Sequence, residues 1–437
     1  MRKNILRTLV AFTGAVAMAG CLGSAPSGGG GGSTPNDPAP KATPGFSTAA
    51  NGLQPGSTGP TDPSTDPSQN PTTNPTPSTD PQPNAPDPAA ALKARAIDYN
   101  QALRTASLKL VGSLPSIDEQ LAVTDATTYA AQIDKYLADP RFAGAMLSYF
   151  QDVFKMGGPA STATGTAHPS FDTAPTFAAE LVVSDQAITS LFTATTNTCP
   201  TLNAAMGTFT DASCAVANGL TTAGVLTDPG VMSQFYSNMA FRRVRWLQET
   251  FACSRFPAEY SATPVAKGNG QYVSPWDFSS ITGGTDTTVA PVNFQDTSSV
   301  VCANCHTTMN HIAPLFAQFD AQGVFQTTIQ VKTPVLMTPT TKLTDWLPST
   351  EKTAWRMGVP AASITELGAA MAKDPVVASC MVSRAWNWAM DKTDIVDDAA
   401  VVPATTIDTV VQGFVAGGYK LKPTLKAIFT ADDYVMF

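Results

Sequence analysis

Residues 302–323 read CANCHTTMNHIAPLFAQFDAQG, and the rest of the chain can be placed around this stretch. It opens with two cysteines three positions apart, Cys302 and Cys305, followed at once by His306. This Cys-x-x-Cys-His pattern is typical of the covalent attachment of a c-type haem. On a helical turn the two thiols share a face and can each add to one vinyl group of the porphyrin, while the imidazole binds the iron as its axial ligand. The stretch therefore predicts one covalently bound haem c.

Two other uses of this motif are possible but have less support. A reduced Cys-x-x-Cys redox site would lie in a strand–helix–strand context, and the neighbouring sequence has no such pattern. A zinc site would need two further ligands. The 437-residue chain contains only two other histidines, His168 and His311. A structural or vestigial motif is therefore kept as the alternative to haem.

The first 21 residues have the features of a bacterial export signal. Three basic residues are followed by an apolar run over residues 9–19, which is too short to span a bilayer. Residues 18–21 then read Met-Ala-Gly-Cys, the pattern of a lipoprotein cleavage site. Cys21 is therefore predicted to become the lipidated N-terminus of a protein held at the cell envelope, on the outer membrane or the cell surface. The alternative is an ordinary secretory signal or a membrane anchor.

Composition divides the remainder of the chain. Residues 22–88 consist mainly of Gly, Pro, Ser, Thr, Asn and Asp, and have too few apolar side chains to offset the entropy of folding. They are predicted to be a disordered linker. The residues that follow are numerous enough for a sizeable core, and we expect two closely packed helical subdomains, 89–225 and 226–437.

Helix signals dominate this folded part. A run of helical periodicity breaks at Gly112, Ser116 and Glu119 have the spacing of a capping box, and later helices are interrupted at Pro140 and at Asp374-Pro375. The predicted fold class is mainly α, a multi-helical, cytochrome-c-like or helical-bundle arrangement that follows the linker.

Three short blocks carry a resemblance to a known family. Residues 136–141 read YLADPR after an amphipathic stretch, Arg242-Arg243 lie in an Arg-rich helix before the haem motif, and residues 318–323 read QFDAQG after it. These blocks and their order resemble planctomycete-type cytochrome-associated proteins, domains of unknown function with a Cys-x-x-Cys-His motif. The resemblance is spread over residues 100–437 and implies a helical protein that binds haem c. Where the family has Asp-Pro after the motif, this chain has Asn310-His311, so the role of that carboxylate does not carry over.

The seven cysteines can be assigned. Cys199 and Cys214 lie fifteen positions apart in a predicted loop of an exported protein, which predicts a local disulfide. Three others are assigned above to lipid and to haem. Cys253 and Cys380 remain, each at an expected helix end near one of the resembling blocks, and are expected to form the second disulfide. The alternative is two separate buried thiols.

A distal ligand for the iron has several candidates. His311 lies five residues beyond His306 and is expected on the same side of the haem. Single-haem cytochromes c usually supply a methionine from the part of the chain after the motif. Met357 in WRMGVP is the first choice and Met337 in PVLMTP the second. His168, another methionine or an open coordination site are the alternatives.

Charge and the absence of other motifs complete the functional prediction. The formal net charge is −8, which argues against nucleic acid and would suit a basic redox partner. No phosphate-binding loop, dinucleotide fingerprint or nucleophile elbow is present. The sequence thus predicts a lipid-anchored monohaem c-type cytochrome that transfers single electrons. The alternatives are a non-enzymatic surface lipoprotein and a subunit of a haem-dependent redox enzyme, for which His168 is the candidate acid–base residue.

Overall fold

The computed structural model describes residues 94–254, 265–267, 270–272, 306, 308–331, 343–356, 359–392 and 402–437. From Arg95 onward the described residues belong to one compact unit that is mostly helical, as the sequence predicts. None of the described helices combines the length and apolar character needed to cross a membrane. Several predicted features lie outside the described residues: the export signal with Cys21, the linker 22–88, Cys302, Cys305, Met337 and Met357.

The unit begins with four helices whose ends follow local sequence signals. They are α2 (Tyr99–Val111), α3 (Ile117–Ala122), α4 (Ala126–Ala138) and α5 (Arg141–Phe154). Gly112 ends α2 at a φ of +70°, a conformation that favours glycine. The hydroxyl of Ser116 accepts from the amide of Glu119 at 3.2 Å, and the Glu119 carboxylate accepts from the amide of Ser116 at 2.7 Å. The predicted capping box is therefore confirmed.

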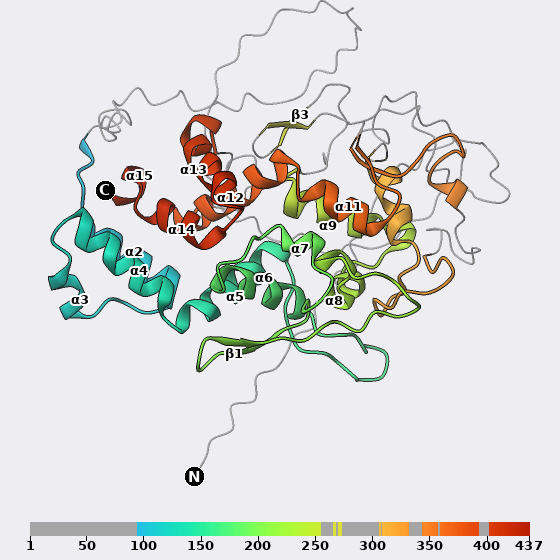
Figure 1. Cartoon of the computed structure of the whole chain (residues 1–437), viewed down its shortest axis with the longest axis horizontal. Coiled ribbons are helices and arrows are strands. Elements are labelled where there is room, and N and C mark those ends of the chain that lie inside the picture. Colours follow the sequence, from blue (N-terminus) through green and yellow to red (C-terminus); the bar gives the residue numbers. More distant parts are fainter. Residues whose placement is uncertain are drawn as a thin grey trace, which may run out of the picture. The chain divides into compact units, whose positions relative to one another are not determined.

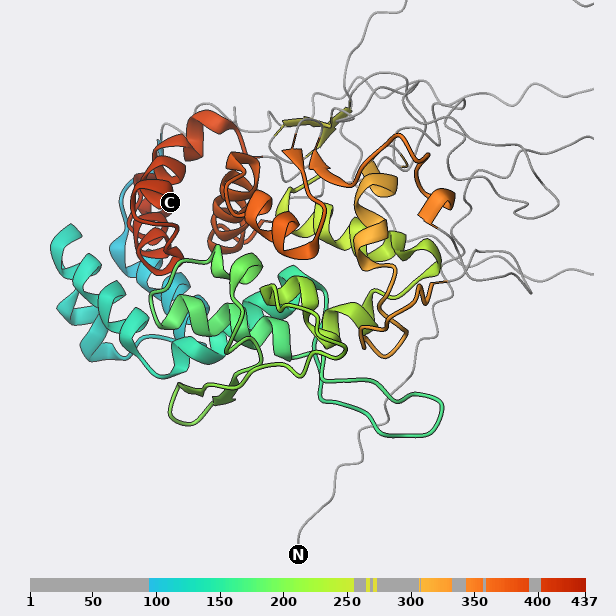
Figure 2. The ribbon, with the colours of Figure 1, turned by 45° about the vertical axis from the view of Figure 1, so that its right-hand side comes forward.

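A second group of elements begins with a largely buried helix, α6. These elements are α6 (Thr173–Val183), α7 (Ser190–Thr193), β1 (Thr201–Asn203), β2 (Thr208–Thr210), η1 (Gly224–Thr227), α8 (Pro229–Gln234), η2 (Asn238–Ala240) and α9 (Phe241–Phe251). Helix α6 lies along α5 (Figures 1 and 2). Its small residues Ala174, Ala178 and Ala179 are completely buried. Residues 196–219, predicted as a plain loop, contain the antiparallel hairpin β1–β2, in which Thr201 pairs with Thr210. The hairpin was missed because its strands are only three residues long.

The remaining elements close over the first two groups. They are β3 (Val265–Lys267), β4 (Gly270–Tyr272), η4 (Ala313–Phe316), η5 (Leu343–Asp345), β5 (Ala354–Arg356), β6 (Val359–Pro360), α11 (Ile364–Met371), α12 (Pro375–Ala389), α13 (Ala404–Ala416), α14 (Leu421–Phe429) and α15 (Asp432–Val435). The predicted break at Asp374-Pro375 is confirmed, since the Asp374 carboxylate caps α12 by accepting from the amide of Val376 at 2.9 Å. Helix α14 packs on α4 and α6, and α11 packs on α7. Elements on both sides of residue 225, the expected subdomain boundary, thus pack together (Figure 2).

Aromatic side chains and a disulfide connect the early and late helices. The Tyr149 ring on α5 lies 5.0 Å from the Trp388 ring on α12. Cys253, just after α9, is joined to Cys380, and both are buried. This pairing is the predicted one, but Cys380 lies inside α12 rather than at a helix end. A cysteine on the buried face of a helix can reach a neighbouring segment of the chain, just as a cysteine at a helix end can.

Candidate functional site

The described part of the haem-attachment stretch begins at His306, whose imidazole is held by Asn310. His306 and residues 308–312 are helical, so the two side chains lie one turn apart. Nδ1 of His306 lies 3.3 Å from the amide oxygen of Asn310, a residue with no exposed surface. Because an amide oxygen accepts and does not donate, Nδ1 carries the hydrogen and Nε2 keeps its lone pair. This is the arrangement by which proteins orient a metal-binding histidine.

The imidazole of His306 packs against an aromatic ring. The ring of Phe241, the first residue of α9, lies 4.9 Å from the imidazole in an edge-on orientation. Burial lowers the pKa of His306 to about 4, and the hydrogen bond with Asn310 opposes part of that shift. The imidazole is therefore neutral near pH 7, the form that binds metals.

The backbone just before Phe241 has an unusual conformation. Met239 and Ala240 both have left-handed backbone angles, with φ of +56° and +57°, and both are completely buried. Non-glycine residues in this region cost on the order of 1–2 kcal/mol each. The indole of Trp346 donates to the carbonyl of Met239 at 2.9 Å. Tertiary contacts thus hold the turn that directs Phe241 toward His306.

A buried arginine fastens the segment after His306 to the rest of the unit. Arg243 on α9 is 1% exposed and donates to four backbone carbonyls. These are Met232 at 3.0 Å, Phe316 at 2.8 Å, Phe319 at 3.2 Å and Asp320 at 3.0 Å. Burial lowers the pKa of Arg243 to about 9, so the guanidinium stays charged at neutral pH. The Arg-rich block of the sequence therefore contains a structural clamp, referred to below as the Arg243 clamp.

The residues QFDAQG form a tight turn against α8. The Asp320 carboxylate accepts from the amides of Gln322 at 2.9 Å and Val324 at 2.8 Å. Gly323 has a φ of +76°, and a Cβ at this position would lie 2.0 Å from the carbonyl oxygen of Pro229. Both the backbone angle and the close approach require glycine here. This explains why an aspartate and a glycine occur three positions apart at the end of the stretch.

His311 is completely buried, and its Nε2 lies 3.7 Å from a carboxylate oxygen of Glu351. The structure therefore places its imidazole beside an acidic side chain that follows η5. The expectation that His311 is not the distal iron ligand stays a prediction.

His168 lies in a separate loop. Its ring stacks on Phe171 with centroids 4.1 Å apart, and Nδ1 lies 2.7 Å from the carbonyl oxygen of Pro169. Its backbone pairs with Ser161. Each of these contacts is local, and none of them connects His168 with His306. A distal role for His168 thus gains no support from these contacts, while Met337 and Met357 lie outside the described residues.

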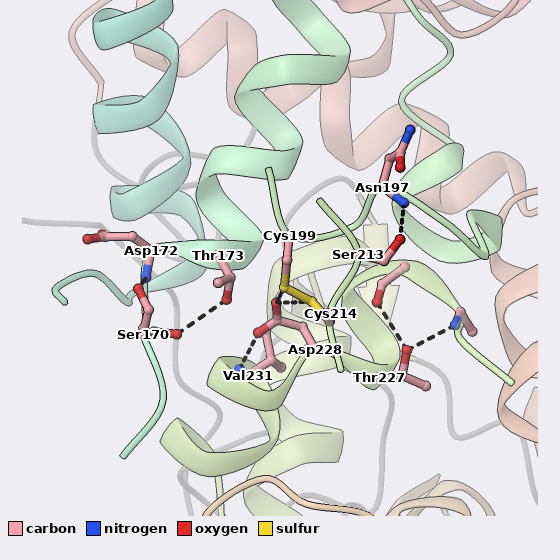
Figure 3. The surroundings of a disulfide bond; sticks show 12 residues. Ser170, Asp172, Thr173, Asn197, Cys199, Ser213, Cys214, Thr227, Asp228 and Val231 are labelled. Carbon is pink, nitrogen blue, oxygen red and sulfur yellow. Dashed lines mark hydrogen bonds between the residues drawn. A yellow bond between two sulfur atoms is a disulfide. The ribbon is translucent and has the colours of Figure 1, made fainter. Parts of the chain in front are cut away.

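The second predicted disulfide joins Cys199 to Cys214 with a Cα–Cα distance of 5.0 Å (Figure 3). Both sulfur atoms lie close to a carboxylate oxygen of Asp228, the residue that caps α8. Within the described part of the chain, these three residues are the one group of His, Cys, Asp or Glu side chains close enough to share a metal ion. Because two of the three are joined in a disulfide, they do not form a ready metal centre.

Sequence reasoning missed three residues of functional interest. Asn310 entered only as a replaced aspartate, although its spacing of four from His306 on a helix is a readable signal. Arg243 entered only as part of a basic block, and no pattern showed that it is buried. Asp228 precedes Pro229, which indicates a helix start, but nothing nearby in the sequence indicates that it faces a disulfide.

No protein-family model, curated protein or solved structure matches this chain. The resemblance to planctomycete-type cytochrome-associated proteins therefore stays a prediction based on short blocks of sequence.

Proposed function

We propose that this chain is a lipid-anchored, monohaem c-type cytochrome of the bacterial cell envelope that transfers single electrons. The observation that carries the proposal is the His306–Asn310 pair, which directly follows the two cysteines of the Cys-x-x-Cys-His motif. In this proposal Cys302 and Cys305 would hold the haem through thioether bonds and His306 would bind its iron. The mainly helical fold agrees with a cytochrome-like architecture without identifying one.

The described residues fit a haem on the chemistry of the donor set. The hydrogen on Nδ1 of His306 is bound by Asn310, which directs Nε2 to act as the metal ligand. The apolar contact with Phe241 also suits the edge of a porphyrin site.

Each residue of the site has a separate task in the proposed mechanism. When bound, the haem iron would accept and release one electron by changing between its ferric and ferrous states. Asn310 holds the proton on Nδ1 and makes the imidazole a stronger donor, while Phe241 limits rotation of the ring. The Arg243 clamp fixes the carbonyls of residues 316–320, so that the helical turn with His306 keeps its place.

The net charge and the export signal indicate the kind of redox partner and the place where the protein would be held. A net charge of −8 favours a basic redox partner, which docks by long-range attraction. Lipid on Cys21 would hold the protein at the membrane, and the linker 22–88 would extend the folded unit away from it. Neither nucleic acid nor a second haem is part of the proposal.

The test is a pyridine haemochrome spectrum of the full chain, exported together with the cytochrome maturation machinery. The wild type should retain a c-type band after extraction with acidified acetone, and Cys302→Ala/Cys305→Ala should lose it. The matched control, Cys199→Ala/Cys214→Ala, also removes two cysteines and should keep the band. A wild type without covalent haem would leave a disulfide-braced surface lipoprotein. A haem with an open sixth position that turns over peroxide would instead identify an enzyme.

A further inference from the structure

The Cys199–Cys214 disulfide differs from a purely structural bridge in its accessibility. Cys199 is partly exposed, and Cys214 is 8% exposed. The hairpin that the bridge encloses, β1–β2, has only exposed and partly exposed residues. The bridge therefore lies near the surface of the described unit, and Cys199 is the cysteine that an incoming thiol would reach first.

A buried carboxyl group lies directly behind the bridge (Figure 3). Asp228 is 1% exposed, and its Oδ2 lies 3.9 Å from Sγ of Cys199 and 3.7 Å from Sγ of Cys214. Neither sulfur of a disulfide carries a hydrogen, so any hydrogen shared in these two contacts is the carboxyl hydrogen of Asp228. Burial raises the pKa of Asp228 to about 6, which keeps the carboxyl group protonated over part of the physiological range.

Helix capping alone does not explain an ionisable group at this position. Oδ1 of Asp228 caps α8 by accepting from the amide of Val231 at 2.9 Å. Asparagine or serine caps a helix about as well and does not bring a buried acid with it. The second oxygen, which faces the sulfurs, is the part of the side chain that the cap does not use.

The other disulfide of the described chain provides an internal comparison. Cys253 and Cys380 are 1% and 0% exposed, and their sulfurs approach only backbone carbonyls in the contacts described. Their bridge spans 127 residues and joins the end of α9 to α12. It has the burial and position of a structural brace, whereas the Cys199–Cys214 bridge closes a short surface loop.

We propose that Cys199–Cys214 is a reactive disulfide that exchanges with an exported dithiol, and that Asp228 is the proton donor to the leaving sulfur. A thiolate of the dithiol attacks Sγ of Cys199, the S–S bond breaks, and its electron pair goes to Sγ of Cys214. The Asp228 carboxyl group gives its proton to that sulfur, so Cys214 leaves as a thiol.

The second thiol of the partner completes the exchange. Its sulfur attacks the mixed disulfide, releases Cys199 as a thiolate, and gives its own proton to water or back to the Asp228 carboxylate. The dithiol is oxidised to a disulfide by two electrons, and the Cys199–Cys214 pair is reduced by the same two. In the reverse direction the Asp228 carboxylate is the base that takes the proton from Cys214.

Asp228 has other charged groups around it in the described part of the chain. Acidic side chains come from the start of α6 (Asp172), from α6 itself (Glu180), from the segment before Cys214 (Asp211) and from the turn packed on α8 (Asp320). The cation is Arg243, which binds the carbonyl of Met232 on α8. The described causes of the Asp228 shift contain no charged group. Because the pKa of Glu180 on α6 is raised to about 7, a pH effect on exchange near 6 is assigned to Asp228 only when Asp228→Asn removes it.

The test follows reduction of the folded, full-length protein by dithiothreitol between pH 5 and pH 8, with alkylation and mass spectrometry to score each disulfide. The rate constant is divided by the concentration of the dithiothreitol thiolate. For Cys199–Cys214 in the wild type, this normalised constant should fall at least tenfold as the pH rises through about 6. In Asp228→Asn, which keeps the oxygen that caps α8, it should be low and flat. The Cys253–Cys380 bridge should stay oxidised in both proteins.

Two results would overturn the proposal. One is a normalised rate constant that does not change with pH in the wild type. This result can be obtained without any variant. The other is a pH profile of Asp228→Asn equal to that of the wild type, with the Cys253–Cys380 bridge and the circular dichroism spectrum confirming that both proteins are folded.

Discussion

Replacing Arg243 with methionine is expected to lower the free energy of unfolding by about 3–5 kcal/mol. Methionine has a long apolar stem but no donor, so the Arg243 clamp is lost. The backbone carbonyls that lose their donor are those of Met232, Phe316, Phe319 and Asp320. Methionine and arginine have similar helix propensities, so the substitution does not by itself weaken α9.

The magnitude follows from two opposing contributions. A hydrogen bond to a charged donor contributes about 1.5–3 kcal/mol, so four carbonyls together give on the order of 6–12 kcal/mol. Burial of the guanidinium opposes this, since its pKa is lowered from 12.5 to about 9. At about 1.4 kcal/mol per pKa unit, the burial costs on the order of 5 kcal/mol. The difference is centred near 4 kcal/mol.

The assay is equilibrium unfolding of the full chain in urea, followed by far-ultraviolet circular dichroism. Arg242→Met is the matched control, because Arg242 is the neighbouring residue on α9 and its side chain is exposed. The control should change the free energy of unfolding by no more than about 0.5 kcal/mol. If Arg243→Met differs from Arg242→Met by less than 1 kcal/mol, the clamp is not a main contributor to stability and the reasoning is wrong.

Three further predictions address the haem site, the pH response and the anchor. Asn310→Leu removes the acceptor from the imidazole of His306 and should raise the reduction potential of the haem by tens of millivolts, whereas Asn310→Asp should lower it. An optical redox titration measures both potentials. Shifts of the same sign would contradict the proposed hydrogen bond. Burial, together with Asp211, raises the pKa of Glu180 from 4.5 to about 7, so the folded state binds the extra proton and stability should fall as the pH rises from about 4.5 to about 7. Between pH 6 and pH 7, above the pKa of Asp228, Glu180→Gln should flatten this decline in urea unfolding curves, and an unchanged slope would rule out Glu180 as its source. Cys21→Ala should abolish incorporation of an alkyne-labelled fatty acid, and a variant that still takes up the label would disprove lipidation at this residue.

Features set by neighbouring residues could be predicted from the sequence. The end of α2 at Gly112, the capping box of Ser116 and Glu119, and the start of α12 at Asp374-Pro375 each depend on contacts within four residues. Both disulfide pairs were also predicted, because the expected export of the chain favours oxidised thiols and few pairings remained.

Features set by distant backbone could not be predicted. Arg243 binds the carbonyl of Phe316, 73 residues away, and every residue type presents the same carbonyl. Such a pairing leaves no pattern in the sequence, in contrast to an ion pair or an apolar stripe. The left-handed angles of Met239 and Ala240 are hidden for a related reason. Neither residue type favours them, and the packing that enforces them comes from elsewhere, including Trp346.

Helix α8 takes part in both the Cys199–Cys214 disulfide site and the Arg243 clamp, and the two can still be tested separately. Asp228 caps the first turn of α8, and its second oxygen faces the disulfide. Later in the helix, the carbonyl of Met232 accepts from Arg243. The hydroxyl of Ser233 donates to the carbonyl of Ala321, in the QFDAQG turn, at 2.9 Å. Asp228→Asn keeps the cap and the clamp but removes the acid. Arg243→Met keeps the acid and the disulfide but removes the clamp. Each variant leaves in place the contacts that the other one removes. If Asp228→Asn changes the exchange rate without loss of stability, Asp228 acts as a proton donor. If it lowers stability without changing the exchange rate, Asp228 acts through packing.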